Sequence, residues 1–585
     1  MKLIDALKII SKKPRPNGNP LKASLVCGFT PLHLQTLLHA ELQLRFPDRQ
    51  VEIKTGLYGD IVGTLSGLRD SHQVDAVALV IEWEDLDARL GIRRLGGWDA
   101  RNPGSVIEQA RLYLSQLHVL LEELCRAAPI AVCLPTLPLP PFFSTAGWQS
   151  SAWEMKLKEE LVSFASALSR QPRAQFVSEQ RLAFLSPQAE RLNVKTELEA
   201  DFPYNLNHAS AVAGLLSCLI QNPAPKKGLI TDLDDTLWRG SAGEVGAQGV
   251  HWDLEHHSQS HGLYQQLLKT LSEEGALVAV ASKNDKAAVE SVFEREDLLL
   301  QKQKIFPLEV GWGSKAEAVL RILNVWNVGA DSVVFVDDNP LELAEVQSQH
   351  PQAHCLQFPT NDPQAVYDLL ASLRDLFGKS AISREDELRL ESIRGNAAMR
   401  EAAGETSNGF SETLLEQSEA ELRFNLQKAA DAGRALELIN KTNQFNLNGR
   451  RVTEAEWQSY LQDDETFLLT AHYKDRFGAL GKIAALAGRR KSSTITVEFW
   501  VMSCRAFSRR IEHQSLKFLF EKFGCGRVIF DYAQTPRNGP LRSFFAGLLK
   551  EPPTFGAASG LEITREQFAG ACPKLFHHVV DLAYE

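Results

Sequence analysis

Three aspartates stand close together in the stretch GLITDLDDTLWRG, which spans residues 228–240. Asp232, Asp234 and Asp235 follow directly on an apolar run that predicts a buried strand. Crowded carboxylates repel one another, and their removal from water is costly. A carboxylate in such a place can attack phosphorus, provided that a cation neutralises the two anions that meet. The spacing therefore points to phosphoryl chemistry.

Further polar residues stand at the ends of other predicted strands. Ser282 ends the apolar run in VAVASKND, and Asp337 and Asp338 end the run in VVFVDDNP. Lys315 begins a helical pattern in GWGSKAEAV. In an open parallel sheet the ligand sits at the carboxyl ends of the strands. We therefore expect these groups to meet Asp232 at one edge of a sheet.

The order of predicted elements indicates three domains with two breaks between them. Strands and helices alternate through residues 1–222 and, more clearly, through 225–377, which predicts two α/β domains, the second of them doubly wound. A Pro- and Lys-rich linker at 221–228 separates them. A polar stretch begins at Gly378, and residues 378–585 follow an α+β pattern.

Composition favours a soluble enzyme. The 585 residues carry a net charge of −10, with 44% hydrophobic and 23% charged residues. The sequence pI of about 5.9 argues against nucleic acid as the main ligand. No apolar run reaches the length of a membrane span, and the N-terminus lacks the features of a signal peptide. We therefore expect a cytoplasmic protein that binds neither nucleic acid nor membrane.

Eight scattered cysteines predict reduced thiols. None forms a C-x-x-C pair, which argues against a disulfide framework and against a structural zinc site.

The four strand-end motifs resemble those of the haloacid dehalogenase (HAD) superfamily. Asp232 to Thr236 match its D-x-D-x-T motif, and Ser282, Lys315 and Asp337–Asp338 match the other three in order. The resemblance implies that Asp232 is the nucleophile and Asp234 the general acid/base. It also implies a Mg²⁺ site, and Asp235 is expected to organise the loop. The implied metal ligands are Asp232, Asp337, Asp338 and, through its backbone carbonyl, Asp234.

The resemblance also implies a set of phosphate-binding residues. These are Thr236, Ser282, Lys283, Asn284 and Lys315. Two other interpretations stay open: the acids cap helices in ordinary βα loops, or the fold is kept without its chemistry.

The flanking residues resemble a narrower group, the FkbH-like branch of that superfamily. TDLDDTLWRGSAGEVG and VASKNDKAAVESVFE carry the likeness in the middle of the chain, and LINKTNQFNLNGRR, DRFGALGKIA and VMSCRAFSRRIE carry it near the end. Such proteins are glyceryl transferase/phosphatases. The resemblance implies dephosphorylation of 1,3-bisphosphoglycerate and transfer of a D-glyceryl unit to the phosphopantetheine thiol of an acyl carrier protein, for polyketide assembly.

The first domain offers a candidate thiol nucleophile. FkbH-like N-terminal regions resemble the SGNH hydrolase fold, whose nucleophile lies in the first strand–helix turn and whose histidine lies in a late D-x-x-H motif. Here those places hold Cys27 and His208, with Asn205 in place of the acid. We hypothesise that Cys27 holds the acyl group and that His208 is its base; the alternatives are a buried, inert cysteine and a helix-capping histidine. Asp60 and residues 81–91 are further candidates for lining a site.

The last domain resembles a GNAT-like acyltransferase fold. The stretch CRAFSRRIEH lacks the glycines of a CoA pyrophosphate turn, so we do not expect acetyl-CoA to bind there. Arg505, Arg509 and Arg510 are candidates for the phosphate of the pantetheine arm, or form a solvated basic helix edge. Two further functions stay open: a stand-alone HAD phosphatase, and a non-catalytic scaffold that binds the carrier protein.

Overall fold

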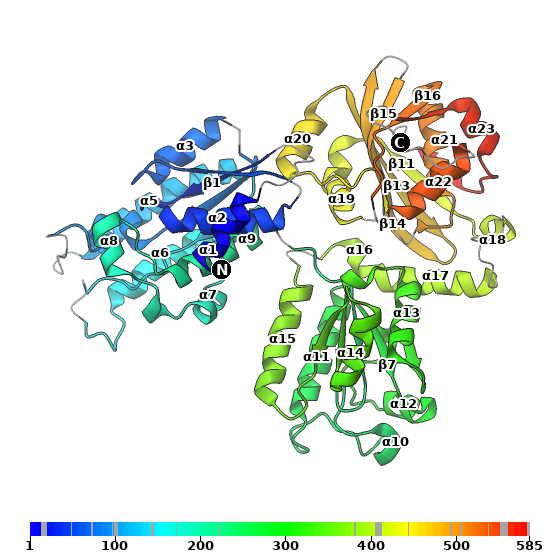
Figure 1. The fold of residues 1–585 in the computed structure, drawn as a ribbon, viewed down its shortest axis with the longest axis horizontal. Coiled ribbons are helices and arrows are strands. Elements are labelled where there is room, and N and C mark those ends of the chain that lie inside the picture. Colours follow the sequence, from blue (N-terminus) through cyan, green and yellow to red (C-terminus); the bar gives the residue numbers. More distant parts are fainter. Residues whose placement is uncertain are drawn as a thin grey trace. The chain divides into compact units, whose positions relative to one another are not determined.

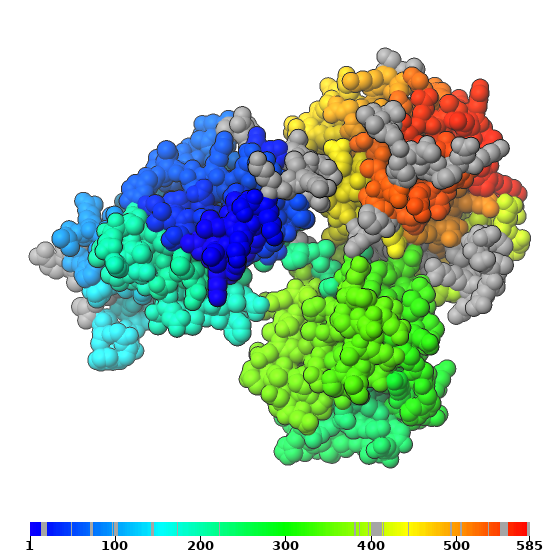
Figure 2. Space-filling view, viewed as in Figure 1, coloured from blue at the N-terminus to red at the C-terminus, as the bar shows by residue number. Residues whose placement is uncertain are grey.

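The chain is described by a computed structural model, drawn in Figure 1. The residues whose structure is described are 1–12, 20–47, 49–71, 74–95, 98, 103–141, 145–171, 173–221, 223–379, 382–403, 412–442, 444–491, 494–503, 506–535, 538–549 and 560–581. They divide into two compact units, Met1–Pro223 with Thr453–Ser459, and Ala224–Val452 with Tyr460–Glu585. Figure 2 shows the same view as a surface, with residues before 224 in blue to cyan-green.

The first sheet is parallel throughout and has the strand order β2-β1-β3-β4-β5. Its strands are β1 (Leu21–Val26), β2 (Val51–Thr55), β3 (Ala76–Val80), β4 (Ile130–Cys133) and β5 (Ala174–Phe176). The helices of this region are α1 (Leu3–Ser11), α2 (Leu32–Arg45), α3 (Ile61–Ser71), α4 (Trp83–Leu86), α5 (Pro103–Leu124), α6 (Ala152–Leu168), α7 (Glu179–Leu185), α8 (Val194–Ala200) and α9 (Leu206–Ile220), with short 3-10 turns at Ala88–Leu90 and Gln188–Glu190.

Helices cover both faces of this sheet because alternate strand residues point to opposite sides. One core joins β1, β3 and β4 to α1, α2 and α9, through residues such as Leu25, Leu38 and Val212. The other joins the same strands to α3, α5 and α6, through residues such as Leu79 and Leu117. The alternating pattern predicted for this part of the chain therefore produces an α/β layer structure.

The second sheet is also parallel throughout, with the order β10-β9-β6-β7-β8. Its strands are β6 (Gly228–Thr231), β7 (Leu277–Ser282), β8 (Ile305–Val310), β9 (Val333–Asp337) and β10 (His354–Gln357). The helices are α10 (Ala242–Val245), α11 (Gln259–Glu273), α12 (Lys286–Phe293), α13 (Lys315–Trp326), α14 (Pro340–Gln349) and α15 (Pro363–Phe377), with 3-10 turns at Lys302–Lys304 and Ala330–Ser332.

Two cores enclose this second sheet. Helices α11, α12 and α15 pack on one face, where Val278 and Val334 point. Helices α13 and α14 pack on the other, against Ile230 and Phe335. The predicted doubly wound α/β fold is confirmed. β6 ends at Thr231, so Asp232 is the first residue beyond its carboxyl end.

The third sheet is mixed, with the order β17-β16-β15-β14-β13-β11-β18, and β12 pairs with β15. Its strands are β11 (Glu421–Asn425), β12 (Phe445–Asn446), β13 (Thr466–Asp475), β14 (Gly478–Lys491), β15 (Thr494–Met502), β16 (Arg527–Phe530), β17 (Leu561–Thr564) and β18 (His578–Asp581). The helices of this part are α16 (Arg384–Glu387), α17 (Arg389–Ala403), α18 (Glu412–Gln417), α19 (Lys428–Lys441), α20 (Glu454–Gln462), α21 (Ile511–Phe523), α22 (Gly539–Leu549) and α23 (Arg565–Ala571).

The antiparallel ladders β13–β14 and β14–β15 set this part apart from the first two sheets. The predicted change from α/β to α+β is therefore present, while the likenesses to SGNH and GNAT folds and the domain boundaries stay predictions. Among the described helices, none is both long and apolar enough to cross a membrane.

Candidate functional site

Three carboxylates meet where two neighbouring strands of the second sheet end. Asp337 is the last residue of β9 and Asp338 follows it, while Asp232 follows β6. The two strands pair in parallel, and the Asp232 amide donates to the Val336 carbonyl at 2.9 Å. Asp232, Asp337 and Asp338 each offer a carboxylate oxygen, and these atoms lie within 4.8 Å of one another. The sheet edge thus gathers the acids as the sequence predicts.

Lys315 neutralises part of this charge. Its ammonium lies 2.8 Å from Asp232 Oδ2 and 2.6 Å from Asp337 Oδ2. All three side chains are buried. Burial lowers the pKa of Lys315, but the two carboxylates outweigh it and raise that pKa. Burial, followed by the charge of Asp232, raises the pKa of Asp337. The lysine is therefore a fixed cation between two acids.

The donor set fits a Mg²⁺ ion. Oδ1 of Asp232 is buried and has no hydrogen-bond partner among the described residues. An orphaned carboxylate oxygen is costly in a folded protein unless a cation reaches it. Carboxylate oxygens are the hard ligands that Mg²⁺ takes, often with waters completing the shell. Asp232, Asp337 and Asp338 are the residues that would hold it.

Thr236 contacts the backbone of one of the acids. Its side chain is fully buried, and its hydroxyl accepts from the Asp338 amide at 3.1 Å. Thr236 thus fixes the backbone that carries a metal-binding candidate, and its expected contact with phosphate stays a prediction. Asp235 has a left-handed backbone with φ of 53°, and its carboxylate accepts from the Gly240 amide at 2.9 Å. It organises the loop, as predicted.

The carboxylate of Asp234 lies outside the three-acid cluster. It accepts from Trp238 Nε1 at 2.9 Å, from the Ala242 amide at 3.1 Å and from Asn284 Nδ2 at 2.9 Å. The role of the Asp234 backbone carbonyl as a metal ligand stays a prediction. Asn284 is 3% exposed and donates to Asp234, and its phosphate contact also stays a prediction. The acid/base role of Asp234 stays a prediction.

Two more predicted phosphate ligands stand beside each other after β7. Ser282 is the last strand residue and is 5% exposed, at the same sheet edge as Asp232. Lys283 points elsewhere, because its ammonium pairs with Glu342 of α14 at 2.7 Å. The structure therefore keeps Ser282 and Lys315 as phosphate-binding candidates and gives Lys283 a different partner.

The thiol of Cys27 is buried directly after β1. It is 5% exposed and donates to the Phe29 carbonyl at 3.2 Å. Burial, with a contribution from the charge of Asp85, raises the pKa of Cys27 to about 12. A reactive cysteine needs the opposite environment, in which the thiolate is favoured. The surroundings thus disfavour Cys27 as a nucleophile.

His208 is not paired with Cys27. It lies in the first turn of α9, fully buried, with Nε2 at 2.9 Å from Thr136 Oγ1 and Nδ1 at 3.0 Å from Ser186 Oγ. Both ring nitrogens have hydroxyl partners, which gives no support to a pairing with Cys27, and the role of His208 as its base stays a prediction. Burial, helped by the charge of Arg191, lowers the pKa of His208 to about 3. Asn205 donates from its amide to the Glu190 carbonyl at 2.8 Å.

This buried histidine makes folding stability depend on pH. The unfolded chain protonates His208 near its ordinary pKa, whereas the folded chain does so only near 3. Acidification from pH 7 to pH 5 therefore favours the unfolded state by about 2 kcal/mol. Between pH 7 and pH 5 the unfolding free energy of His208→Gln should fall by about 2 kcal/mol less than that of the wild type. Urea unfolding at the two pH values measures this difference.

The exposed His578 of β18 provides the control for this experiment. His578→Gln should follow the wild type at both pH values, because the substitution removes no buried imidazole. Equal pH slopes for the wild type and for His208→Gln would contradict the assignment of a neutral, buried imidazole.

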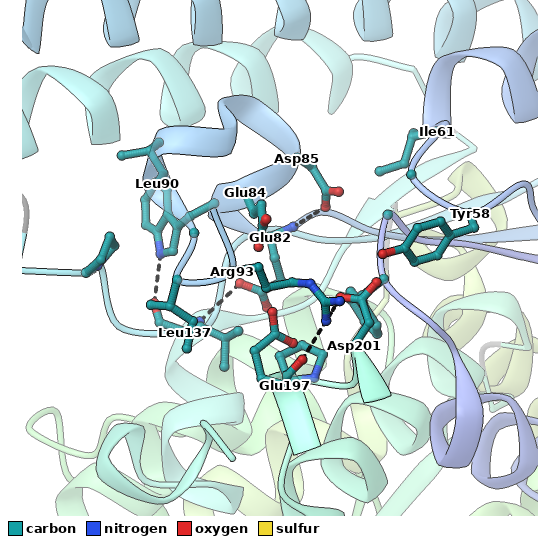
Figure 3. A pocket seen from close by; sticks show the side chains of 18 of the residues that line it. Tyr58, Ile61, Glu82, Glu84, Asp85, Leu90, Arg93, Leu137, Glu197 and Asp201 are labelled. Atoms are coloured by element: carbon teal, nitrogen blue, oxygen red, sulfur yellow. Dashed lines mark hydrogen bonds and ion pairs between the residues drawn. The ribbon is translucent and has the colours of Figure 1, made fainter. Parts of the chain in front are cut away.

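A cavity of about 310 Å³ lies in the first unit (Figure 3). Asp60 and several residues of 81–91 line it, as do residues that the sequence did not single out. Glu197 and Asp201 are among the latter, because the stretch VKTELEAD reads as an ordinary polar helix.

The arginines of the last part of the chain are held by other residues. Arg505 lies outside the described residues. Arg509 is 2% exposed, and its guanidinium pairs with Asp475 at 3.3 Å. Arg510 pairs with Glu412 at 3.1 Å and donates to the Lys574 carbonyl at 2.6 Å. Burial and the charge of Asp475 therefore disfavour Arg509 as a ligand of a pantetheine phosphate, and that role stays a prediction.

Comparison with known proteins shows a fold that this chain shares with a solved structure. No protein-family model matches the chain, and no curated protein matches it. An extracellular lipase from Streptomyces rimosus aligns over 34% of this chain and all of its own, at 12% identity and a TM-score of 0.25, which supports no inference. The N-terminal part of the protein BF1531 from Bacteroides fragilis, which contains a phosphatase domain and was solved with Mg, is 19% identical and has a TM-score of 0.53. The alignment covers 65% of this chain and 100% of that one, and it shows that the two share a fold.

Proposed function

We propose that this chain is a Mg²⁺-dependent phosphatase that transfers the phosphoryl group of its substrate to Asp232. One observation carries the proposal: the three carboxylates of Asp232, Asp337 and Asp338 converge at a sheet edge, with Lys315 between two of them. Buried acids that only capped helices would not need to meet. The orphaned oxygen of Asp232 supports the same conclusion.

Each residue of the site has a separate role in the proposed reaction. Asp232 attacks phosphorus, the P–O bond to the substrate breaks, and the leaving oxygen takes a proton from Asp234. Water then attacks the aspartyl-phosphate, which releases phosphate and restores the carboxylate. Lys315 and the hydroxyl of Ser282 hold the phosphoryl oxygens. A bound Mg²⁺ supplies the charge neutralisation that lets one anion approach another.

Asp234 and its partners form a supporting group for this chemistry. Asn284 and Trp238 donate hydrogen bonds to the Asp234 carboxylate and so fix its position. A general acid held in this way needs a small movement to reach a leaving group. Thr236 supports Asp338 in a similar way, because its hydroxyl accepts a hydrogen bond from the Asp338 amide.

The finer proposal concerns the substrate and the acceptor. We infer a phosphorylated three-carbon substrate such as 1,3-bisphosphoglycerate, whose glyceryl unit passes to the phosphopantetheine thiol of an acyl carrier protein. The likeness of residues 231–246 and 280–294, and of three later segments, to FkbH-like proteins supports this inference. The phosphate ester of the substrate is removed through Asp232, with cleavage of its P–O bond. In the transfer itself the pantetheine thiol attacks the acyl carbon of the acyl phosphate and loses its proton to solvent. The C–O bond to that phosphate breaks, so phosphate leaves as the thioester forms. A stand-alone phosphatase and a non-catalytic scaffold remain the alternatives.

The test measures phosphate release and carrier loading together. Purified chain is mixed with 1,3-bisphosphoglycerate, Mg²⁺ and a phosphopantetheinylated carrier protein, and the carrier is weighed by mass spectrometry. We expect Mg²⁺-dependent phosphate release and a carrier mass gain equal to one glyceryl group. Phosphate release that needs Mg²⁺ but never loads a carrier would favour the stand-alone phosphatase. Failure of both activities would favour the scaffold.

Cys27 is left out of this proposal. Because its thiol is buried and its pKa is raised, we expect Cys27→Ala to release phosphate within about twofold of the wild-type rate. Intact-mass measurement after incubation with 1,3-bisphosphoglycerate checks the point independently. An acyl adduct that forms on the wild type and is lost in Cys27→Ala would return Cys27 to the mechanism.

A further inference from the structure

The cavity of the first unit lies where an α/β sheet of this order binds ligands. It is lined from the carboxyl ends of β1, β2, β3 and β4, across the point where the strand order reverses between β1 and β3. Open α/β sheets hold ligands in the crevice at such a reversal. Its volume of about 310 Å³ is at the lower end of the range for small-molecule sites. The cavity belongs to a different sheet from Asp232, so a ligand in it would go beyond the proposed phosphatase.

The charge of the lining selects against anions. Six acidic side chains and one basic side chain stand among the described lining residues: Asp60, Glu82, Glu84, Asp85, Glu197, Asp201 and Arg93. Figure 3 shows the carboxylates around Arg93, which pairs with Asp201 at 2.8 Å and donates to the Glu197 carbonyl at 2.5 Å. The single cation is thus already paired, and the other ionisable acids of the wall have no basic side chain of the lining left to pair with.

Three of these acids have structural roles. Asp85 accepts from the Glu82 amide at 2.7 Å at the start of α4. Glu82 is buried and accepts from Thr136 Oγ1 and from the Tyr204 hydroxyl, each at 2.6 Å. Asp60 accepts from the Gly63 amide at 2.6 Å and so holds the first turn of α3. The carboxylates of Glu82 and Asp60 therefore have hydrogen-bond donors within the protein.

Glu197 is different, because its carboxylate lacks a partner. It lies on α8 and is 5% exposed, and its Oε2 has no hydrogen-bond partner among the described residues. Burial, followed by the charges of Asp201 and Glu84, raises the pKa of Glu197 to about 7. Burial and neighbouring carboxylates likewise raise the pKa of Asp85 to about 8. A buried, unsatisfied acceptor among like charges is destabilising, so its presence points to a donor that arrives from outside.

That donor is not a single metal ion. A metal ion needs several ligand atoms around one point. Among the described residues, two groups of three side chains bring their ligand atoms within 4.8 Å of one another, and neither includes an acid of this cavity. The carboxylates are spread around the wall instead. The wall also contains apolar side chains, including Phe29, Ile61, Trp83, Leu90 and Leu137. A ligand with both a cationic group and a hydrocarbon body matches the carboxylates and the apolar side chains of this wall.

We propose that this cavity binds a small organic amine as its ammonium ion. The ammonium donates to Glu197, and its positive charge favours the ionised forms of Glu84 and Asp85, while the hydrocarbon body packs against Trp83, Leu90 and Leu137. An ammonium carries up to three donors and can therefore serve spread acceptors that a metal ion cannot. The aromatic face of Trp83 suits a cation with an apolar neighbour.

Calorimetric titration of the full chain with benzylamine tests the proposal. Benzyl alcohol serves as the uncharged analogue and Mg²⁺ as the metal probe. We expect one benzylamine per chain with Kd on the order of 1 mM, and binding at least about tenfold weaker for benzyl alcohol. Glu197→Gln should weaken benzylamine binding by about tenfold, because one charged acceptor is lost.

Glu199→Gln is the matched control, since Glu199 is exposed on the same helix and does not line the cavity. It should bind benzylamine as the wild type does. Thermal unfolding of the ligand-free variants verifies folding: Glu197→Gln should unfold at the wild-type temperature or above it, because a like charge has been removed from a buried group. No benzylamine binding to the wild type, equal binding of benzyl alcohol, or unchanged binding by Glu197→Gln would each overturn the proposal.

Discussion

Replacing Asp232 by asparagine is expected to lower Mg²⁺-dependent phosphate release by at least about 1,000-fold, which is the scale on which loss of a nucleophile acts. The substitution keeps the size of the side chain but removes the charge that attacks phosphorus. It also removes one of the two carboxylates that contact Lys315. Steady-state phosphate release at saturating substrate measures the loss as a fall in kcat.

The exposed acid Asp368 of α15 provides the matched control for this substitution. Asp368→Asn should keep wild-type kcat, because it changes the net charge of the chain by the same amount far from the sheet edge. If Asp232→Asn were to keep more than about a tenth of wild-type turnover, the covalent mechanism would be wrong.

Replacing Lys315 by methionine is expected to damage both activity and stability. The ammonium is buried between Asp232 and Asp337, and its removal leaves two carboxylates that repel each other out of water. Loss of one partner from a buried ion pair costs about 3–5 kcal/mol of unfolding free energy. Loss of one charge that stabilises the transition state lowers kcat by about 100-fold or more.

Magnesium separates this electrostatic role from simple damage to the core. In Lys315→Met, added Mg²⁺ should raise the unfolding temperature by more than it does in the wild type, because the ion replaces the missing positive charge. Lys269→Met, on the exposed side of α11, should behave as the wild type in both measurements. An equal Mg²⁺-induced shift in Lys315→Met and in the wild type would count against the role given to the lysine.

The sequence predicts the sheet edge well because its signals are local. The apolar runs before Asp232, Ser282 and Asp337 become β6, β7 and β9, and the helical pattern after Ser314 becomes α13. The edge strands β8 and β10 lack such a local signal. Pro307 interrupts the pattern of β8, and no residue of β10 is fully buried, so neither has the continuous apolar run of a central strand.

The roles of single side chains depend on partners that are distant in the sequence. Thr236 meets the amide of Asp338, which is 102 residues away, and Asn284 meets Asp234 across 50 residues. Motif spacing places these residues at the site, but it does not reveal which of them contact ligand and which hold a neighbour.

The first unit shows the same limit more strongly. The positions of Cys27 and His208 suggested a catalytic pair, yet Thr136 and Ser186 occupy the histidine ring. Neither partner stands in a recognisable motif. Glu197 was missed for a related reason, because an acid on a polar helix carries no sign that it is buried.

The most direct test of the proposed mechanism is to find the phosphoryl group on the chain. Wild-type protein is mixed with Mg²⁺ and an acyl phosphate, quenched in acid during turnover, reduced with borohydride and mapped by peptide mass spectrometry. Reduction of an aspartyl-phosphate marks the residue that carried it. We expect the mark on Asp232, and we expect it to disappear in Asp232→Asn or without Mg²⁺. Turnover that leaves Asp232 unmarked while another residue carries the mark would contradict the mechanism.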